Sequence, residues 1–449
     1  MNLLRIWGTR KFFSIAAIYY LLLLTLFFFT QKSRVPDSSL VLMQILGMGL
    51  LVFFSLLYDK HSISKTILIV VIFQLICSFG LRYFNIDYFN NPLGYRPYDA
   101  LLYHRYGSHI ELSLFGFIKY LNVLEVRLDD MGFPLIIFLV YHLSGDPVTG
   151  IHLLVLFNVI AISISSYYLY KISNLFFEKE ISCFITFFWG TELYAVYTAS
   201  AGLKENFMIM FIVIAIYYII LVNRRMFIKN IICAVLFSLP LLLFRSSVFY
   251  MLIAVLLFIV ALRLPIVKQY FYVYIFLITL LACIYYYQII DQLAMQLGYS
   301  NDFLEILVDR KVRRQGNMTF IMNYLASVVG PLPNLISDDI VKRNFITLYS
   351  FSSLCKVFYS FFFIYGVYGI FKKKHYELIG VFIFWLLDTA MLDLTLFAQH
   401  DRYQWSHIPF TIILAIYGLK CWKENRHILS WDRWYMVIAF LIIIIFNLR

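Results

Sequence analysis

A polar stretch, GYRPYDALLYHRYGSHI at residues 94–110, lies between long runs of apolar residues. Its titratable groups include Arg96, Asp99, His104 and Arg105. An aspartate beside aromatic residues at a membrane surface can act as general base towards a sugar hydroxyl, so Asp99 is a candidate catalytic residue. The alternative is a helix-capping or solvated aspartate, since surface carboxylates are common. Arg96, His104 and Arg105 are candidate substrate-binding residues.

A basic stretch, DRKVRRQGN at residues 309–317, contains Arg310, Lys311, Arg313 and Arg314. Guanidinium groups match phosphate oxygens in a bidentate geometry, so a lipid-linked phosphate or pyrophosphate would suit this cluster. Two other interpretations stay open: contact with ordinary anionic headgroups, or a different topology from the one derived below.

A third polar stretch, AQHDRYQW at residues 398–405, supplies His400 and Arg402 as further substrate-binding candidates. No His, Asp or Glu pair there has convincing metal-ligand spacing, so a divalent metal is not supported. The six cysteines lie far apart, mostly in apolar runs, and predict neither a disulfide nor a metal site. We therefore expect no cofactor.

Charged residues also stand within or at the ends of the apolar runs. Glu205 is a second candidate base, and Lys204 and Arg245 are candidate substrate-binding residues; snorkelling to the interface is the alternative for the two cations. Asp388 lies near the middle of its run, where an unpaired ionised group costs roughly 2.5–3.5 kcal/mol or more. It is either functional or hydrogen-bonded to a neighbouring helix.

The elements that must position these groups are membrane-spanning helices. The chain has 449 residues, of which 62% are hydrophobic, and a mean hydropathy of +0.81. Soluble domains are about half apolar. The apolar runs are long and do not alternate, so the fold class is all-α: a polytopic transmembrane helical bundle forming one domain over residues 1–449. The net charge of +12 is typical of cytoplasmic Lys/Arg loops and predicts no nucleic-acid partner.

The predicted spans number about 13. They cover residues 12–30, 40–58, 66–82, 149–170, 181–200, 206–222, 228–244, 247–263, 270–290, 346–371, 377–398, 409–422 and 433–447. Basic residues at the start place the N-terminus in the cytoplasm. Keeping the NRR and KKKH turns cytoplasmic requires residues 132–145 to be re-entrant or interfacial and residues 319–335 to insert only partly. The two long loops, 82–130 and 291–345, are then extracytoplasmic.

Four segments of the chain have a recognisable pattern: LRYFNIDYFNNPLGYRPYDALLYHRYG, GFPLIIFLVYHLSGDPVTGIHLLVLFN, LKENFMIMFIVIAIYYIILVNRR with LLLFRSS, and, more loosely, HDRYQWSHIPF. This pattern resembles that of bacterial envelope-polysaccharide enzymes, namely the polyprenyl-phosphate glycosyltransferases of the GT-C type and the related O-antigen or exopolysaccharide polymerases. The likeness covers roughly residues 80 to 260. Many GT-C enzymes have two adjacent acidic residues in the first loop. Here Asp99 stands alone, and the nearby acidic pair Asp129–Asp130 comes later.

The resemblance implies a multi-pass protein of the bacterial inner membrane that acts as an inverting glycosyltransferase or polymerase. A polyprenyl-linked saccharide would lie in the outer leaflet with its phosphate on Arg and Lys. Asp99 or Glu205 would deprotonate the acceptor hydroxyl. Partners would be membrane lipids and other polysaccharide-assembly proteins. The alternative is a lipid-linked sugar flippase or secondary transporter, which Asp388 favours.

Overall fold

The structure is a computed structural model that describes residues 9–30, 38–94, 98–224, 226–264, 350–394, 404–424 and 431–448, with a few residues between 266 and 335. Every regular element within these residues is a helix, which confirms the all-α class. Most of the predicted loop 291–345 lies outside the described residues, as does most of the proposed partial insertion at 319–335.

The chain begins with three long helices and continues through a group of short ones. In order they are α1 (Thr9–Thr30), α2 (Ser38–Leu57), α3 (Ile63–Phe89), α4 (Tyr98–Gly107), α5 (Leu114–Val123), η3 (Leu128–Asp130), α6 (Gly132–Ser144) and α7 (Pro147–Ser173). The later elements are α8 (Lys179–Gly190), α9 (Leu193–Ala201), α10 (Glu205–Leu221), α11 (Phe227–Ser238), α12 (Leu241–Phe244), α13 (Ser246–Ala261), α20 (Ser350–Lys372), α21 (Tyr376–Leu394), α23 (Ile408–Glu424) and α24 (Trp431–Leu448).

Four helical stretches among the described residues are long and apolar enough to cross a membrane: Ile63–Phe89, Pro147–Ser173, Phe227–Phe244 and Ser350–Lys372. Within α1 and α2, the apolar stretches whose side chains are described are shorter, at Phe12–Leu26 and Val41–Leu57. Such lengths and compositions are those of a membrane protein. The count of about 13 crossings stays a prediction.

Two predicted spans are interrupted. The run at 181–200 forms α8 and α9, which are separated at Thr191 and Glu192. The backbone N–H of Leu193, left without an intrahelical acceptor, donates to Ser352 Oγ at 3.2 Å. The run at 228–244 is divided between α11 and α12 at Leu239 and Pro240, because proline lacks an N–H to donate. A side-chain acceptor such as Ser352 Oγ allows irregular backbone inside an apolar bundle.

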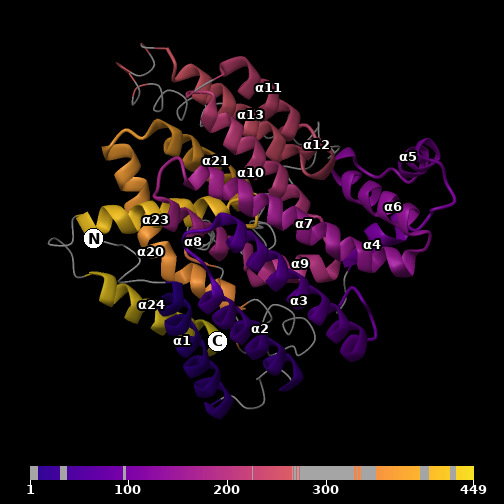
Figure 1. The fold of residues 1–449 in the computed structure, drawn as a ribbon, viewed down its shortest axis with the longest axis horizontal. Helices are drawn as coiled ribbons and strands as arrows, with labels where there is room; N and C mark the ends of the chain where they lie inside the picture. The colour runs from indigo at the N-terminus through magenta and orange to yellow at the C-terminus, as the bar shows by residue number, and fades with distance from the viewer. Residues whose placement is uncertain are drawn as a thin grey trace.

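The predicted first outer loop is largely helical. It contains the end of α3 together with α4, α5 and η3, and with α6 these short helices gather at one end of the molecule (Figure 1). Phe117 of α5 stacks on Phe138 of α6 with ring centroids 4.3 Å apart. The 13 residues of α6 rise ~20 Å, less than the ~30 Å hydrocarbon core. Its re-entrant or interfacial placement stays a prediction.

Helices α20 and α23 cross with their backbones in contact. A Cβ at Gly418 would lie 1.7 Å from the carbonyl oxygen of Phe362. A Cβ at Gly366 would lie 2.0 Å from the carbonyl oxygen of Leu414. Small residues commonly permit such close approach between apolar helices. This crossing fixes the part of the bundle that carries the buried polar groups described below.

Replacing Gly418 with alanine is expected to lower the thermal midpoint of the detergent-solubilised protein, since the added methyl group meets backbone that cannot move aside. Overpacking typically costs about 1–3 kcal/mol. Gly49→Ala is the matched control, because no atom lies within 4 Å of a Cβ at Gly49. Equal midpoints for the two variants, measured by fluorescence-detected size exclusion after heating, would contradict the close crossing.

Candidate functional site

The site lies where three segments distant in sequence meet: the end of η3, the start of α10 and the end of α12. Gly132, the first residue of α6, makes this approach possible. A Cβ there would lie 2.9 Å from both Cβ and the carbonyl oxygen of Leu243 in α12. Glycine at this position therefore brings the acidic pair, Asp129 and Asp130, against the main bundle.

Lys204 is the centre of this arrangement. Its Nζ atom donates to Asp130 Oδ1 at 2.5 Å and to the carbonyl oxygen of Phe244 at 2.9 Å. The ring of Tyr103 lies 5.6 Å from the same Nζ. The Lys204 side chain is only 7% exposed, whereas that of Asp130 is 34% exposed. The ammonium is therefore buried and compensated, and its carboxylate partner still reaches solvent.

The acidic pair has a second cation on its other side. Arg127 Nε lies 3.4 Å from Asp129 Oδ1, and Arg127 Nη2 lies 3.5 Å from Asp130 Oδ2. The hydroxyl of Tyr103 donates to Asp130 Oδ1 at 3.3 Å. The two carboxylates thus lie between one buried and one partly exposed cation.

The pKa values of the two carboxyl groups are shifted in opposite directions. Burial raises the pKa of Asp129, and the neighbouring charge of Asp130 adds to that rise. Burial would also raise the pKa of Asp130, but the ammonium of Lys204 outweighs burial and the pKa of Asp130 is lowered. Adjacent acids whose pKa values are pushed apart are typical of sites that transfer protons.

Glu205 and Arg245 lie close enough for their charges to act on the Lys204 ammonium. Glu205 is fully buried in the first turn of α10, and Arg245 precedes α13 in an extended conformation. The sequence placed Lys204, Glu205 and Arg245 among the candidates, and the structure brings all three together. We call Lys204, Arg127, Arg245 and the acidic pair the Lys204 cluster.

The candidates on α4 have different surroundings. Asp99, in the first turn of α4, and Arg105, in its last turn, are exposed. His104 is buried, and its Nδ1 hydrogen-bonds with the hydroxyl of Tyr141. Burial and then the charge of Arg82 lower the pKa of His104 to about 3. At neutral pH this imidazole is uncharged, so it supplies no positive charge to a phosphate.

Sequence reasoning missed the structural role of Arg82 near the end of α3. The residue is fully buried, and its guanidinium donates to the carbonyl oxygen of Ser200 at 2.6 and 3.1 Å. It also donates to the carbonyl oxygen of Ile151 at 2.7 Å. Arg82 therefore holds the end of α9 and the start of α7 in place, directly before the chain reaches Lys204. The sequence did contain a signal for this role, because Arg82 is a charged residue in an apolar run.

Seven predicted site residues lie outside the described part of the chain: Arg96, Arg310, Lys311, Arg313, Arg314, His400 and Arg402. Their proposed role in binding substrate stays a prediction. Within the described residues, no group of three or more His, Cys, Asp or Glu side chains could hold a metal ion.

A second polar group is buried between α21 and α23. Asp388 Oδ2 accepts from Ser406 Oγ at 2.5 Å and lies 2.8 Å from His407 Nδ1. Both Asp388 and His407 are buried. Nearby, the ammonium of Lys356 donates to Gln404 Oε1 and, at 2.5 Å, to the carbonyl oxygen of Gly330. The expected hydrogen bond between Asp388 and a neighbouring segment is therefore present, and its partners are Ser406 and His407.

Breaking the pair between Lys204 and Asp130 is expected to destabilise the fold. Asp130→Asn and Lys204→Met should each cost about 3 kcal/mol, the lower end for a buried pair because Asp130 keeps contact with solvent. The double variant should cost clearly less than the sum of the single variants. Thermal unfolding of the four proteins tests this, and additive losses would mean that the two groups are not coupled.

The same pair predicts a pH dependence. Because the folded pKa of Asp130 lies below its ordinary 3.8, the pair stabilises the protein above that pH, and the stabilisation is lost as the pH falls through the lowered value. The free energy of unfolding of the Lys204→Met variant should therefore fall less on acidification than that of the wild type.

Comparison with known proteins adds no relative to this description. No protein-family model, curated protein or solved structure matches the chain. The likeness to polysaccharide enzymes therefore stays a prediction from short sequence motifs.

Proposed function

We propose that this chain transfers a sugar, or an oligosaccharide repeat unit, from a polyprenyl-phosphate or polyprenyl-pyrophosphate carrier. The reaction would take place on the extracytoplasmic side of the bacterial inner membrane. The observation that carries the proposal is the Lys204 cluster, in which two acids of opposite pKa shift lie beside a buried ammonium.

The cations suit the leaving phosphate. Lys204 and Arg245 lie near each other at the ends of apolar helices, and the partly exposed Arg127 lies on the other side of the acidic pair. In glycosyl transfer from a lipid phosphate, negative charge grows on the phosphate oxygen as its bond to the anomeric carbon breaks. Fixed cations in a site of restricted water access stabilise that developing charge strongly.

The acids suit the acceptor. A general base removes the proton from the acceptor hydroxyl while its oxygen attacks the anomeric carbon from the side opposite the phosphate, with inversion. A base works best when its pKa lies near the working pH, and Asp129 is the acid whose pKa is raised. Asp99 is the alternative base, because it is exposed near the start of α4. Glu205, fully buried, fits a charge-balancing role beside Lys204 better than contact with an acceptor.

Asp129→Asn is expected to reduce product formation by about 100-fold or more while the amount of folded protein holds, since general-base catalysis typically contributes 10²–10⁴-fold. Asp99→Asn tests the alternative base in the same assay. Glu111→Gln is the matched control, an exposed acid between α4 and α5. The assay follows chain extension on a polyprenyl-pyrophosphate oligosaccharide in proteoliposomes. Full activity of both aspartate variants would overturn the proposal.

A second candidate, proton-linked transport of a lipid-linked sugar, is favoured by the Asp388–His407 pair. Ionisable groups buried inside a membrane bundle commonly mark ion or proton pathways. The carboxylate and imidazole lie 2.8 Å apart, so one proton can be shared between them. This candidate makes no use of the Lys204 cluster, and the two functions can therefore be separated by variants.

If transport is the function, Asp388→Asn should abolish the dependence of lipid-linked sugar translocation on an imposed pH gradient, because the pair loses its titrating carboxylate. Translocation of a fluorescent polyprenyl-phosphate sugar in proteoliposomes is the measurement. Asp59→Asn, at the turn between α2 and α3, is the matched control. Wild-type protein that shows no translocation with or without the gradient would remove this candidate.

A further inference from the structure

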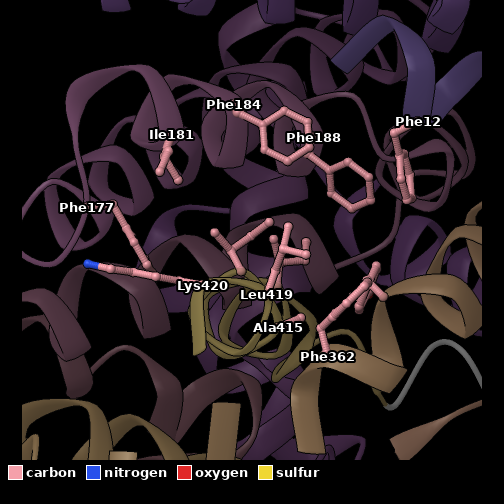
Figure 2. A pocket seen from close by; sticks show the side chains of 12 residues that line it. Phe12, Phe177, Ile181, Phe184, Phe188, Phe362, Ala415, Leu419 and Lys420 are labelled. Carbon is pink, nitrogen blue, oxygen red and sulfur yellow. The ribbon is translucent and has the colours of Figure 1, made fainter. Parts of the chain in front are cut away.

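An apolar groove lies between α8, α20 and α23, with Phe12 of α1 at one end (Figure 2). Phe184 and Phe188 of α8 form one wall, and Ala415 and Leu419 of α23 form the other. Most of these side chains are buried, but Leu419 keeps partial exposure, so the groove opens along α23. It shares no residue with the Lys204 cluster or with the Asp388–His407 pair.

The lining positions of the groove on α23 extend over a length comparable to most of the depth of one membrane leaflet. They run from Ile412 to Lys420, a rise of ~12 Å along a helix. Half of a ~30 Å hydrocarbon core is ~15 Å. The walls of the groove are aromatic and aliphatic, and they offer an acyl chain the same kind of surface as the membrane interior.

Among the described residues that line the groove, Lys420 is the one that carries a charge. Figure 2 shows its amine beside Phe177, at the end away from Phe12. The Lys420 side chain is exposed. The groove therefore has a long apolar floor with a single ammonium group at one end.

Basic groups also lie near that end of the groove. Burial lowers the pKa of His375, the charge of Glu377 raises it, and the nearby charges of Lys373 and Lys420 lower it. The ring of His375 lies 5.4 Å from that of Tyr417, which in turn lies 6.5 Å from the ring of Phe177. The nearby acid, Glu377, is paired with Arg224 at 3.3 Å.

We propose that this groove binds one acyl chain of an anionic phospholipid from the cytoplasmic leaflet, with the lipid phosphate on Lys420. The KKKH turn that contains Lys373 is the end assigned to the cytoplasm by its basic residues. Each lysine near a membrane surface contributes about 1 kcal/mol of attraction to anionic lipid. The site goes beyond the proposed glycosyl transfer, whose lipid carrier would lie at the other membrane face.

The test uses the full chain in nanodiscs that contain phosphatidylglycerol or phosphatidylcholine with a photoreactive group on one acyl chain. Mass spectrometry then maps the crosslinked residues. We expect the phosphatidylglycerol probe to label α8 and α23 at the groove in preference to other helices. Lys420→Ala should reduce the preference for phosphatidylglycerol over phosphatidylcholine roughly fivefold, the effect of about one surface lysine.

Two further variants keep the result interpretable. Ala415→Phe fills the groove and should reduce labelling by both probes, whereas Lys229→Ala, an exposed lysine on α11, should leave labelling unchanged. Uniform labelling around the bundle, or an equal headgroup preference in wild type and Lys420→Ala, would overturn the proposal. Displacement of the phospholipid by an equal amount of polyprenyl phosphate would also overturn it, because the groove would then belong to a carrier lipid.

Discussion

The contact between the Lys204 ammonium and the Asp130 carboxylate joins two parts of the molecule that otherwise meet through buried apolar side chains, such as Phe133 against Phe207. One part is the group of short helices α4 to α6, and the other is the bundle that begins again at α7. An ammonium that is 7% exposed needs a partner, because an unpaired buried charge is costly. This requirement fixes the end of η3 against α10 and α12, and so determines which side chains can act together.

The sequence predicted the elements of the fold better than their junctions. Long apolar runs indicated helices, and most of these helices occur where expected, because composition alone selects a helix in an apolar environment. The breaks within 181–200 and 228–244 were not predicted. The first depends on Ser352 accepting a freed N–H, a contact between distant parts of the chain that no local pattern shows. The second had a local signal in Pro240 that the length of the apolar run outweighed.

In the candidate site too, the residues were easier to predict than the contacts between them. Lys204, Glu205 and Arg245 were found because charges stand out in apolar sequence, and the structure places them together. The acidic pair was recognised, but its late position in the chain obscured its proximity to Lys204, which depends on Gly132 allowing α12 to approach. His104 is the opposite case. Its neighbours in the sequence are polar, yet in the fold its side chain is buried and uncharged.

The backbone contact between α20 and α23 has a mechanical consequence. With Gly366 and Gly418 each facing a carbonyl group of the other helix, there is little room for either helix to rotate or slide against the other. His407 directly precedes α23, whereas Asp388 belongs to α21. Any rearrangement that separates the Asp388 carboxylate from the His407 imidazole must therefore tilt α21, while α20 and α23 keep their positions.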